Sequence, residues 1–375
     1  MALKVMTIVG TRPELIKLSR VIAELDARLP HVLVHTAQNF DYELNKIFFE
    51  QLEIRKPNHF LETAAGTPAQ TIANVIAKSD EILEREKPDA LLLLGDTNSC
   101  LAAIAAKRRK VPIFHMEAGN RCFDQRTPEE INRKIVDHVS DINLPYSEHA
   151  RRHLLAEGLK SDTVIKTGSP MKEVLQYYMP KIERSAVLKE LSLGPGGYFL
   201  VSAHREENVD VQENLFALLD SIRALQETYR VPVIFSTHPR TRKRLEEQGR
   251  SDAGPDVRFL KPFGFLDYVK LQMNARCVIS DSGTITEESS IIGFPAITVR
   301  NTHERQEGMD EGTLIMSGLR TENVLKSIEV TLAHHVEGKR VFRTVPDYEA
   351  DNVSKKVVRL ILSYTGYVNR YTWHR

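Results

Sequence analysis

Short apolar runs that recur between longer amphipathic segments limit the fold of this chain more than any other feature. Runs of this length suit strands buried on both faces, and the segments between them suit helices. The runs are Lys4–Val9, Val32–Thr36, Ala90–Leu94, Val111–His115, Thr163–Ile165, Tyr198–Ser202, Val231–Ser236, Val257–Phe259, Cys277–Ser280 and Ala296–Val299. Such alternation predicts parallel sheets covered by helices, so we expect an α/β fold of two Rossmann-like, doubly wound domains.

The length of 375 residues allows two domains of ordinary size. A turn at Thr167–Pro170 predicts the boundary. We therefore expect an N-terminal Rossmann-like domain over 1–170 and a C-terminal one over 171–352. The last segment, 353–375, is predicted to be helical and could return to the first domain.

Composition excludes several classes of function. The net charge is +1, so we expect no nucleic-acid partner and no electrostatic attraction to an anionic membrane. No apolar run reaches 18 residues and no secretory signal precedes the first run, which predicts a cytoplasmic protein without membrane insertion. The three cysteines lack metal-site or disulfide-framework spacing, and no Walker or dinucleotide motif occurs. We therefore predict no metal and no cofactor.

Polar residues gather where the apolar runs end. These clusters are Gly10–Glu14, Gly95–Ser99, His115–Glu117, Ala203–Glu206, Thr237–Arg240, Asp281–Thr284 and Arg300–Glu307. In open α/β sheets, ligands bind at the carboxyl ends of the strands. Two such sheets facing each other would enclose a cleft lined by these groups.

Three carboxylates in the first half are candidates for proton transfer. Glu117 ends an apolar run, and Thr127–Glu130 predicts a helix start in which Glu130 completes a capping box. That leaves Glu129 without a structural role. Asp96 also ends an apolar run; it either caps the next helix or acts as an acid whose pKa burial raises. Acids opposite phosphate-binding groups suit proton removal coupled to departure of a phosphate leaving group.

The phosphate-binding candidates come from both halves. Thr11 and Glu14 form a predicted capping box, which leaves Arg12 and Lys17 available for a ligand. His204 and Arg205 follow a strand and suit a pyrophosphate.

In the second half, Ser282, Gly283 and Thr284 open a predicted helix whose amino end favours an anion. Glu287 either pairs with Thr284 as a cap or reaches ribose hydroxyls. His238 takes a structural interpretation first and is kept as a candidate ligand-binding residue.

Together these motifs resemble the non-hydrolysing UDP-N-acetylglucosamine 2-epimerase family. In the family's order they are Gly10–Glu14 with Lys17, Gly95–Thr97, His115–Gly119, Pro128–Glu130 with Asn132 and Arg133, His204–Glu206 with Asn208, Asp281–Gly283, Glu287 with Glu288, and Glu304 with Arg305. The resemblance implies a GT-B-like pair of domains facing each other, with the site between them, and a homodimer.

The resemblance also implies a mechanism. UDP is eliminated across C1–C2 of a UDP-N-acetylhexosamine to give a 2-acetamidoglycal, and UDP adds back after C2 is protonated from the other face. It assigns proton transfer to Asp96, Glu117 and Glu129, with Lys17 orienting the acids. His204 assists the pyrophosphate. Arg12, Arg205, the amides of Ser282–Gly283, Thr284, Glu287 and His238 complete the UDP-binding set.

The loop Asn120–Arg126 resembles that of the capsule and O-antigen enzymes that complete UDP-N-acetyl-L-fucosamine. It therefore predicts UDP-2-acetamido-2,6-dideoxy-L-talose as the substrate, with UDP-N-acetylglucosamine as the alternative. Segment Thr36–Asn39 departs from the family's allosteric motif, so we expect no such activation. A GT-B glycosyltransferase, a hydrolysing epimerase and an inactive nucleotide-sugar sensor are the competing hypotheses.

Overall fold

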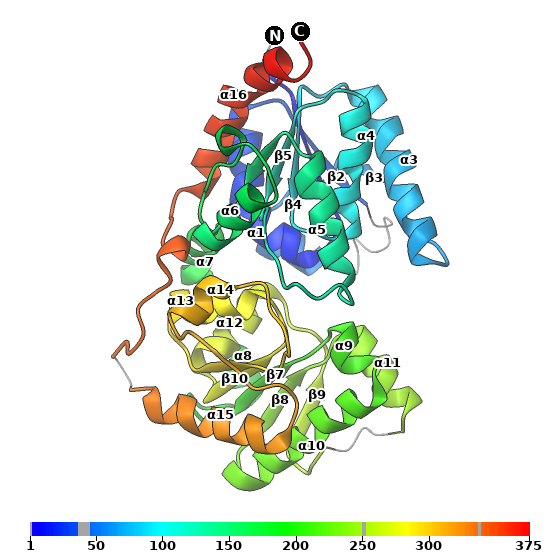
Figure 1. Cartoon of the computed structure of the whole chain (residues 1–375). Coiled ribbons are helices and arrows are strands. Elements are labelled where there is room, and N and C mark those ends of the chain that lie inside the picture. The colour runs from blue at the N-terminus through cyan, green and yellow to red at the C-terminus, as the bar shows by residue number, and fades with distance from the viewer. Residues whose placement is uncertain (1, 37–45, 250–252, 337–338) are drawn as a thin grey trace. The chain divides into compact units, whose positions relative to one another are not determined.

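The computed structural model describes residues 2–36, 46–249, 253–336 and 339–375. Contacts divide the chain into two compact units, and the division falls inside one helix. Unit 1 comprises Met1–Tyr177 with Asp347–Arg375, and unit 2 comprises Tyr178–Pro346. Each unit contains a six-stranded sheet whose paired strands are all parallel, which confirms the predicted fold class (Figure 1). The predicted ranges 1–170, 171–352 and 353–375 remain predictions.

The sheet of unit 1 has the order β3-β2-β1-β4-β5-β6. Its strands are β1 (Val5–Val9), β2 (His31–His35), β3 (His59–Phe60), β4 (Ala90–Leu94), β5 (Ile113–Met116) and β6 (Ile142–Leu144). The central strands β1 and β4 are buried along their whole length, as their apolar sequences require. The strand order reverses between β1 and β4, which is where open α/β sheets place ligands.

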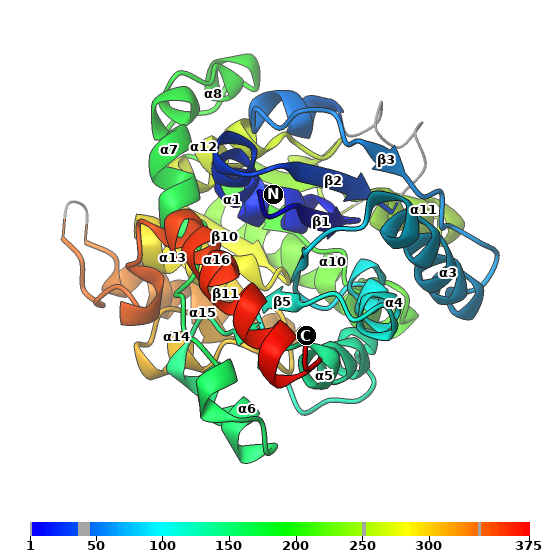
Figure 2. The ribbon, with the colours of Figure 1, turned by 90° about the horizontal axis from the view of Figure 1, so that it is seen from above.

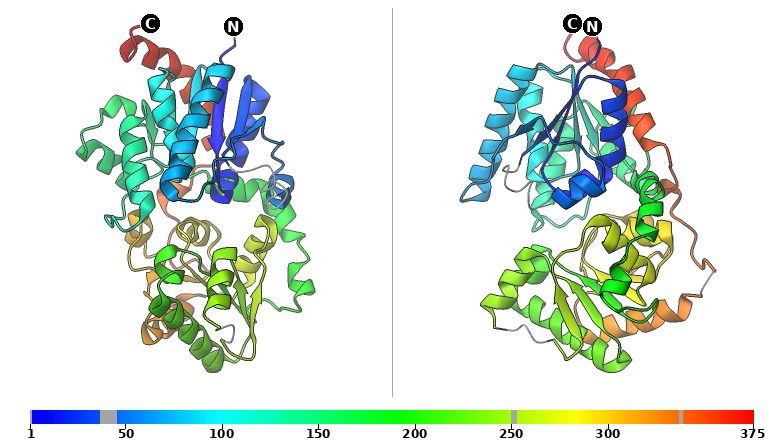
Figure 3. Two further views of the ribbon diagram at one scale, coloured as in Figure 1. Left: turned by 90° about the vertical axis from the view of Figure 1, so that its right-hand side faces the viewer. Right: turned by 180° about the vertical axis from the view of Figure 1, so that it is seen from behind.

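Helices cover both faces of this sheet (Figure 2). They are α1 (Arg12–Arg28), α3 (Pro68–Glu86), α4 (Ala102–Arg108), α5 (Pro128–Val139), α6 (Glu148–Ala156) and α16 (Val353–Tyr371), together with the first part of α7 (Met171–Glu183). Helix α16 packs against α1, so the C-terminal segment belongs to unit 1. The described N-terminal residues and the C-terminus consequently lie at the same end of this unit (Figure 3).

Unit 2 repeats the design with the order β12-β11-β10-β7-β8-β9. Its strands are β7 (Phe199–Ser202), β8 (Val233–Ser236), β9 (Val257–Leu260), β10 (Cys277–Ser280), β11 (Ala296–Thr298) and β12 (Ile315–Met316). Its helices include α8 (Val187–Glu190), α9 (Glu206–Val209), α10 (Gln212–Tyr229), α11 (Pro239–Glu247), α12 (Phe265–Asn274), α13 (Thr284–Ile292), α14 (Gln306–Asp310) and α15 (Thr321–His334). Here the order reverses between β7 and β10.

The predicted strand at Thr163–Ile165 is wrong. Residues Ser161–Thr163 form a short 3-10 helix, and Val164 makes only an isolated bridge to Asn143. The edge strands β3, β6 and β12 were not predicted, because two or three residues are too few to show a pattern. Within the described residues, every helix is too short or too polar to cross a membrane.

Candidate active site

The first turn of α1 lies at the reversal point of unit 1. The buried carboxylate of Glu14 accepts hydrogen bonds from the Gly10 and Thr11 backbone N–H groups at 2.9 and 2.6 Å, which confirms the predicted capping box. It also accepts one from the Ser99 hydroxyl at 2.5 Å. Burial raises the pKa of Glu14, and these donors only partly offset the effect. Glu14 therefore ties the turn after β1 to the turn after β4.

Arg12 and Lys17 project from the same helix and have different surroundings. The Arg12 guanidinium lies 4.9 Å from the centre of the Phe48 ring, and burial lowers its pKa. Lys17 is almost fully buried, and its Nζ lies 2.6 Å from Oε2 of Glu117. The structure thus brings Lys17 and Glu117 together, as an orienting role for Lys17 requires.

Glu117 follows β5 directly and has a left-handed backbone with φ of 62°. This conformation is unusual for a residue with a side chain, and such residues gather at functional sites. The Asn120 side-chain amide lies 3.4 Å from Oε1 of Glu117, opposite the contact to Lys17. The carboxylate is therefore held from two sides at the carboxyl end of the sheet.

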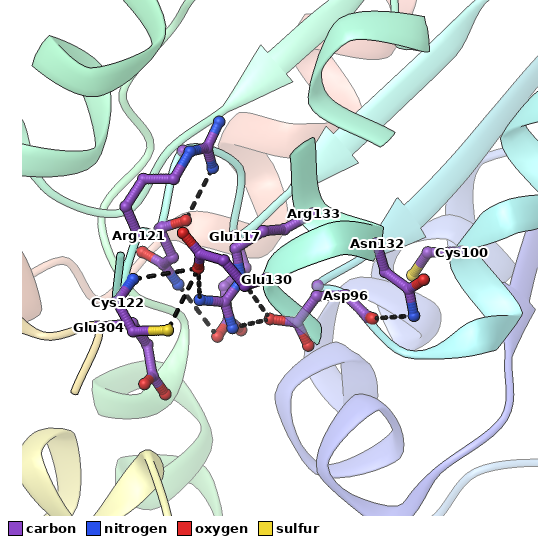
Figure 4. A network of polar contacts seen from close by, with 12 residues as sticks. Asp96, Cys100, Glu117, Arg121, Cys122, Glu130, Asn132, Arg133 and Glu304 are labelled. Carbon is purple, nitrogen blue, oxygen red and sulfur yellow. Dashed lines mark hydrogen bonds and ion pairs between the residues drawn. The ribbon is translucent and has the colours of Figure 1, made fainter. Parts of the chain in front are cut away.

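Arg133 holds Asp96, another of the predicted acids, in place (Figure 4). Its Nε and one terminal nitrogen donate to Oδ2 of Asp96 at 3.0 and 2.6 Å, and its other terminal nitrogen donates to Glu130 at 2.8 Å. The Asn132 side chain donates to the Asp96 carbonyl at 2.9 Å. Since β4 and β5 are paired in register, the turns that carry Asp96 and Glu117 are neighbours at one edge of the sheet.

The predicted role of Glu130 in a capping box with Thr127 is wrong. Thr127 is the N-cap of α5 but makes no side-chain capping hydrogen bond. The Glu130 carboxylate instead accepts from the backbone N–H groups of Cys122 and Phe123 at 3.1 and 3.2 Å, and so holds the preceding loop. Glu129 is half-buried in the first turn of α5. It lies three and four residues before Asn132 and Arg133, which places it on the helix face that meets Asp96.

The loop that suggested an L-fucosamine enzyme is largely structural in this chain. The side chain of Arg121 is completely buried and donates to Asp137 at 2.7 Å and to Glu157 at 2.8 and 2.6 Å. Asp124 accepts hydrogen bonds from Arg126 within the loop. These contacts explain the loop's charged composition without reference to a sugar.

Asp281 organises the candidate phosphate-binding residues of unit 2. This buried carboxylate follows β10 and accepts from the backbone N–H groups of His204 and Arg205 at 3.0 Å, and from the Asn208 side chain at 3.1 Å. The Nδ1 atom of His204 lies 3.3 Å from the same carboxylate. The turns after β7 and β10, which flank the reversal point, are therefore joined through one side chain.

Gly283 has a packing role that the sequence did not suggest. A Cβ at this position would lie 2.6 Å from Oε1 of Glu304. Glu304 in turn lies 3.4 Å from a guanidinium nitrogen of Arg205 and accepts from Arg300 at 2.8 Å. The Ser282 and Thr284 hydroxyls are 3.0 Å apart. Arg205 and Gly283, both predicted to bind UDP, thus lie against Glu304, which the sequence indicated only as part of a motif.

Two other predicted UDP-binding residues already have protein partners. Glu287 is fully buried, and its Oε2 lies 3.3 Å from Arg305, which is also buried. His238 is the N-cap of α11, and its Nδ1 accepts the Arg240 backbone N–H at 3.3 Å, in agreement with the structural interpretation. Its ring centroid lies 5.5 Å from that of His204.

Among the described residues, no group of three or more His, Cys, Asp or Glu side chains is arranged to hold a metal ion. The predicted residues form two sets. Asp96, Glu117, Glu129 and Lys17 lie at the reversal edge of unit 1, where Arg133 and Glu130 were missed as partners. His204, Arg205 and Ser282–Thr284 lie at the reversal edge of unit 2, where the role of Asp281 in holding the two turns together was missed. Long-range partners of this kind carry no local sequence signal.

Comparisons with known proteins agree with the motifs. The family model described as UDP-N-acetylglucosamine 2-epimerase matches residues 23–362. The structure of UDP-N-acetylglucosamine 2-epimerase from Rickettsia bellii is 58% identical, covers 100% of both chains and superimposes with a TM-score of 0.94. That of Methanocaldococcus jannaschii UDP-GlcNAc 2-epimerase in complex with UDP-GlcNAc and UDP is 33% identical over 96% of this chain and 100% of that one, with a TM-score of 0.89. In sequence, the M. jannaschii UDP-N-acetylglucosamine 2-epimerase is 34% identical over 88% of this chain and 92% of its own.

These similarities do not support the predicted L-fucosamine branch and favour the alternative that the sequence left open. The buried contacts of Arg121 show in addition that part of the loop on which that prediction depended has a structural role. Most of the segment used to argue against allosteric activation, Thr36–Asn39, lies outside the described residues.

Proposed function

Since the chain belongs to the UDP-N-acetylglucosamine 2-epimerase family and is an isomerase acting on a UDP-sugar, we propose that it interconverts UDP-N-acetylglucosamine and UDP-N-acetylmannosamine. The observation that carries this proposal is the set of carboxylates at the reversal edge of unit 1, held by Lys17 and Arg133. The full-length similarity to glucosamine epimerases supports the substrate.

The proposed reaction proceeds by elimination and addition. A carboxylate removes the C2 proton while the C1–O bond breaks, and UDP leaves with the bonding electron pair. A C1=C2 double bond forms, giving a 2-acetamidoglycal. In the reverse sense a UDP phosphate oxygen attacks C1, and C2 takes a proton from the opposite face. All atoms are conserved, and no oxidant or reductant is consumed.

The residues divide between these steps by their chemistry. Asp96, Glu117 and Glu129 supply the acid and base at C2, and Lys17 keeps the Glu117 side chain in one orientation. His204 and Arg205 neutralise charge on the departing diphosphate, together with Arg12, the Ser282–Gly283 amides and Thr284. Glu287 and His238 complete the proposed UDP-binding set, although the contacts of His238 fit a helix cap better.

Proton exchange tests the proposal. Incubation of UDP-N-acetylglucosamine with the enzyme in D2O should place deuterium at C2 and yield UDP-N-acetylmannosamine, both visible by NMR. Parallel samples contain UDP-2-acetamido-2,6-dideoxy-L-talose, so that faster exchange there would restore the L-fucosamine assignment. Release of free N-acetylmannosamine would indicate a hydrolysing enzyme. Transfer of the sugar to an acceptor would indicate a glycosyltransferase, and UDP binding without exchange would indicate a sensor.

A matched pair of variants tests the assignment of the base. Glu117→Gln should abolish exchange and leave UDP affinity within about threefold of wild type, because the UDP-binding set comes from other residues. Glu84→Gln removes an exposed carboxylate of the same unit and should leave both unchanged. If UDP binding collapses in Glu117→Gln, Glu117 is not a base acting at C2. The predicted homodimer, which light scattering can test, and the role in capsule or O-antigen synthesis remain predictions.

A further inference from the structure

His115 is a completely buried histidine to which the proposed function gives no role. It lies on β5, two residues before Glu117. Its Nε2 is 2.7 Å from the Gly95 carbonyl oxygen, and its Nδ1 is 3.0 Å from Oδ1 of Asp137. Both ring nitrogens therefore face an oxygen atom at hydrogen-bonding distance.

Both of these oxygens act only as acceptors. A backbone carbonyl has no hydrogen to donate. Asp137 also accepts from the Gly119 N–H at 3.2 Å and from Arg121 at 2.7 Å, which are the surroundings of an ionised carboxylate. A neutral imidazole has one N–H and one lone pair. One of the two ring nitrogens would then lie, unprotonated, beside an acceptor oxygen. The contact of Nδ1 with Asp137 is an ion pair at 3.0 Å whose angle is too poor for a hydrogen bond, but only the doubly protonated ring makes both contacts attractive.

One acceptor, Gly95, belongs to the turn that carries Asp96, and the other, Asp137 of α5, holds the turn that carries Glu117. Gly95 immediately precedes Asp96 in the turn after β4, and its φ of 79° makes that turn sharp. Asp137 holds the N–H of Gly119, two residues beyond Glu117. We propose that His115 is a positioning residue that is an imidazolium at neutral pH and joins the Asp96 turn to the Glu117 turn. The catalytic part of this inference rests on the proposed function, whereas the protonation state does not.

The charges around the ring are consistent with this state. Burial opposes the charge, but the close contact with the Asp137 carboxylate, the Gly95 carbonyl and the charge of Asp96 outweigh it, so the pKa of His115 is raised. The other charged groups nearby are Arg121 from the loop, which shares Asp137, and Glu157, the C-cap of α6, which pairs with Arg121. Lys17 and Glu117 form their own pair beyond the end of β5.

Raising the pKa of His115 in the folded state fixes the sign of its effect on stability. The stabilisation is fully present below the pKa of about 6.5 that histidine has in the unfolded chain, and it is lost as pH rises through the folded pKa. Alkaline pH should therefore loosen both turns together.

The first experiment uses the wild-type protein and needs no activity. In protein labelled with 15N-histidine, the His115 ring, identified by its contacts with Gly95, should show a bonded proton on both nitrogens at pH 7. These protons should exchange slowly with water, because the side chain is inaccessible. A ring with one protonated nitrogen overturns the proposal, whether or not the enzyme is an epimerase and whether or not any variant folds.

The second experiment compares His115→Gln with His138→Gln. His138 is a half-exposed histidine of α5 whose Nε2 lies 3.1 Å from Glu157, so it controls for loss of a histidine–carboxylate contact. We expect His115→Gln to lower kcat by about tenfold or more and leave KM within about threefold, since positioning acts on the chemical step. The kcat of wild type should decline as pH rises through the folded pKa of His115, and His115→Gln should lack this decline. Unaltered kcat and pH profile in folded His115→Gln refute the positioning role, and His138→Gln should match wild type.

Discussion

The ion pair between Lys17 and Glu117 leads to a stability prediction that is independent of catalysis. The two side chains are 4% and 10% exposed, and their charged atoms are 2.6 Å apart. Removing one partner of a buried pair costs about 3–5 kcal/mol, because the other charge stays buried without compensation. We expect about 3 kcal/mol for Lys17→Met. We expect about 2 kcal/mol for Glu117→Gln, whose amide oxygen still accepts from Lys17.

The double variant separates the pair from its surroundings. With neither charge left to bury, Lys17→Met with Glu117→Gln should cost about 3 kcal/mol, which gives a coupling energy of about 2 kcal/mol. The same cycle on the exposed pair of Arg28 and Glu24 is the control, and its coupling should stay below about 0.5 kcal/mol.

The chain contains a natural reporter for this measurement. Its single tryptophan, Trp373, belongs to unit 1, and its ring lies 5.2 Å from Nζ of Lys107. Tryptophan fluorescence during urea unfolding therefore follows the unit that contains the ion pair. The midpoints should shift at constant slope. A coupling energy no larger than that of the control pair would contradict the argument that burial makes this contact strong.

Three further predictions follow from the described contacts. Glu129→Gln should lower kcat by about 100-fold or more in the C2 exchange assay, a typical cost of losing an acid or base, and shift the urea midpoint little because the residue is half-buried. Gly283→Ala should weaken UDP binding by about tenfold in calorimetry, because its Cβ displaces Glu304 from Arg205; unchanged affinity would remove this contact from the UDP site. Since burial raises the pKa of Cys277 to about 12 and also raises that of Cys100, native protein at pH 8 should react slowly with a thiol reagent and unfolded protein quickly at all three cysteines.

The fold was predictable because the central strands are buried on both faces. Runs such as Ala90–Leu94 and Cys277–Ser280 contain almost only apolar residues, and each coincides with an observed strand. The edge strands need not be buried on both faces and are short, so β3 and β12 were missed. The error at Thr163–Ile165 has the same cause, since an apolar pair of residues can pack without joining a sheet.

The candidate site was predictable only for residues placed by local rules. The position after a strand identified Glu117 and His204, and the capping pattern identified the turn at Thr11. The partners of these residues were not predictable, because the contacts between Lys17 and Glu117 and between Arg133 and Asp96 join residues far apart in the chain. For Glu130, the local sequence pattern predicted the helix start but not the role of the side chain. Its carboxylate accepts hydrogen bonds from two loop N–H groups instead of the backbone N–H of the N-cap residue.

The backbone of Glu117 shows why a site of several acids needs this network. A left-handed conformation costs a residue with a side chain about 1–3 kcal/mol, and glycine would avoid that cost. A glycine there would supply no carboxylate and would remove the ion pair with the buried Lys17. Neighbouring carboxylates also repel one another unless cations lie between them. Lys17 on Glu117 and Arg133 on Asp96 supply such cations, as the proposed action of both acids on one carbon atom requires.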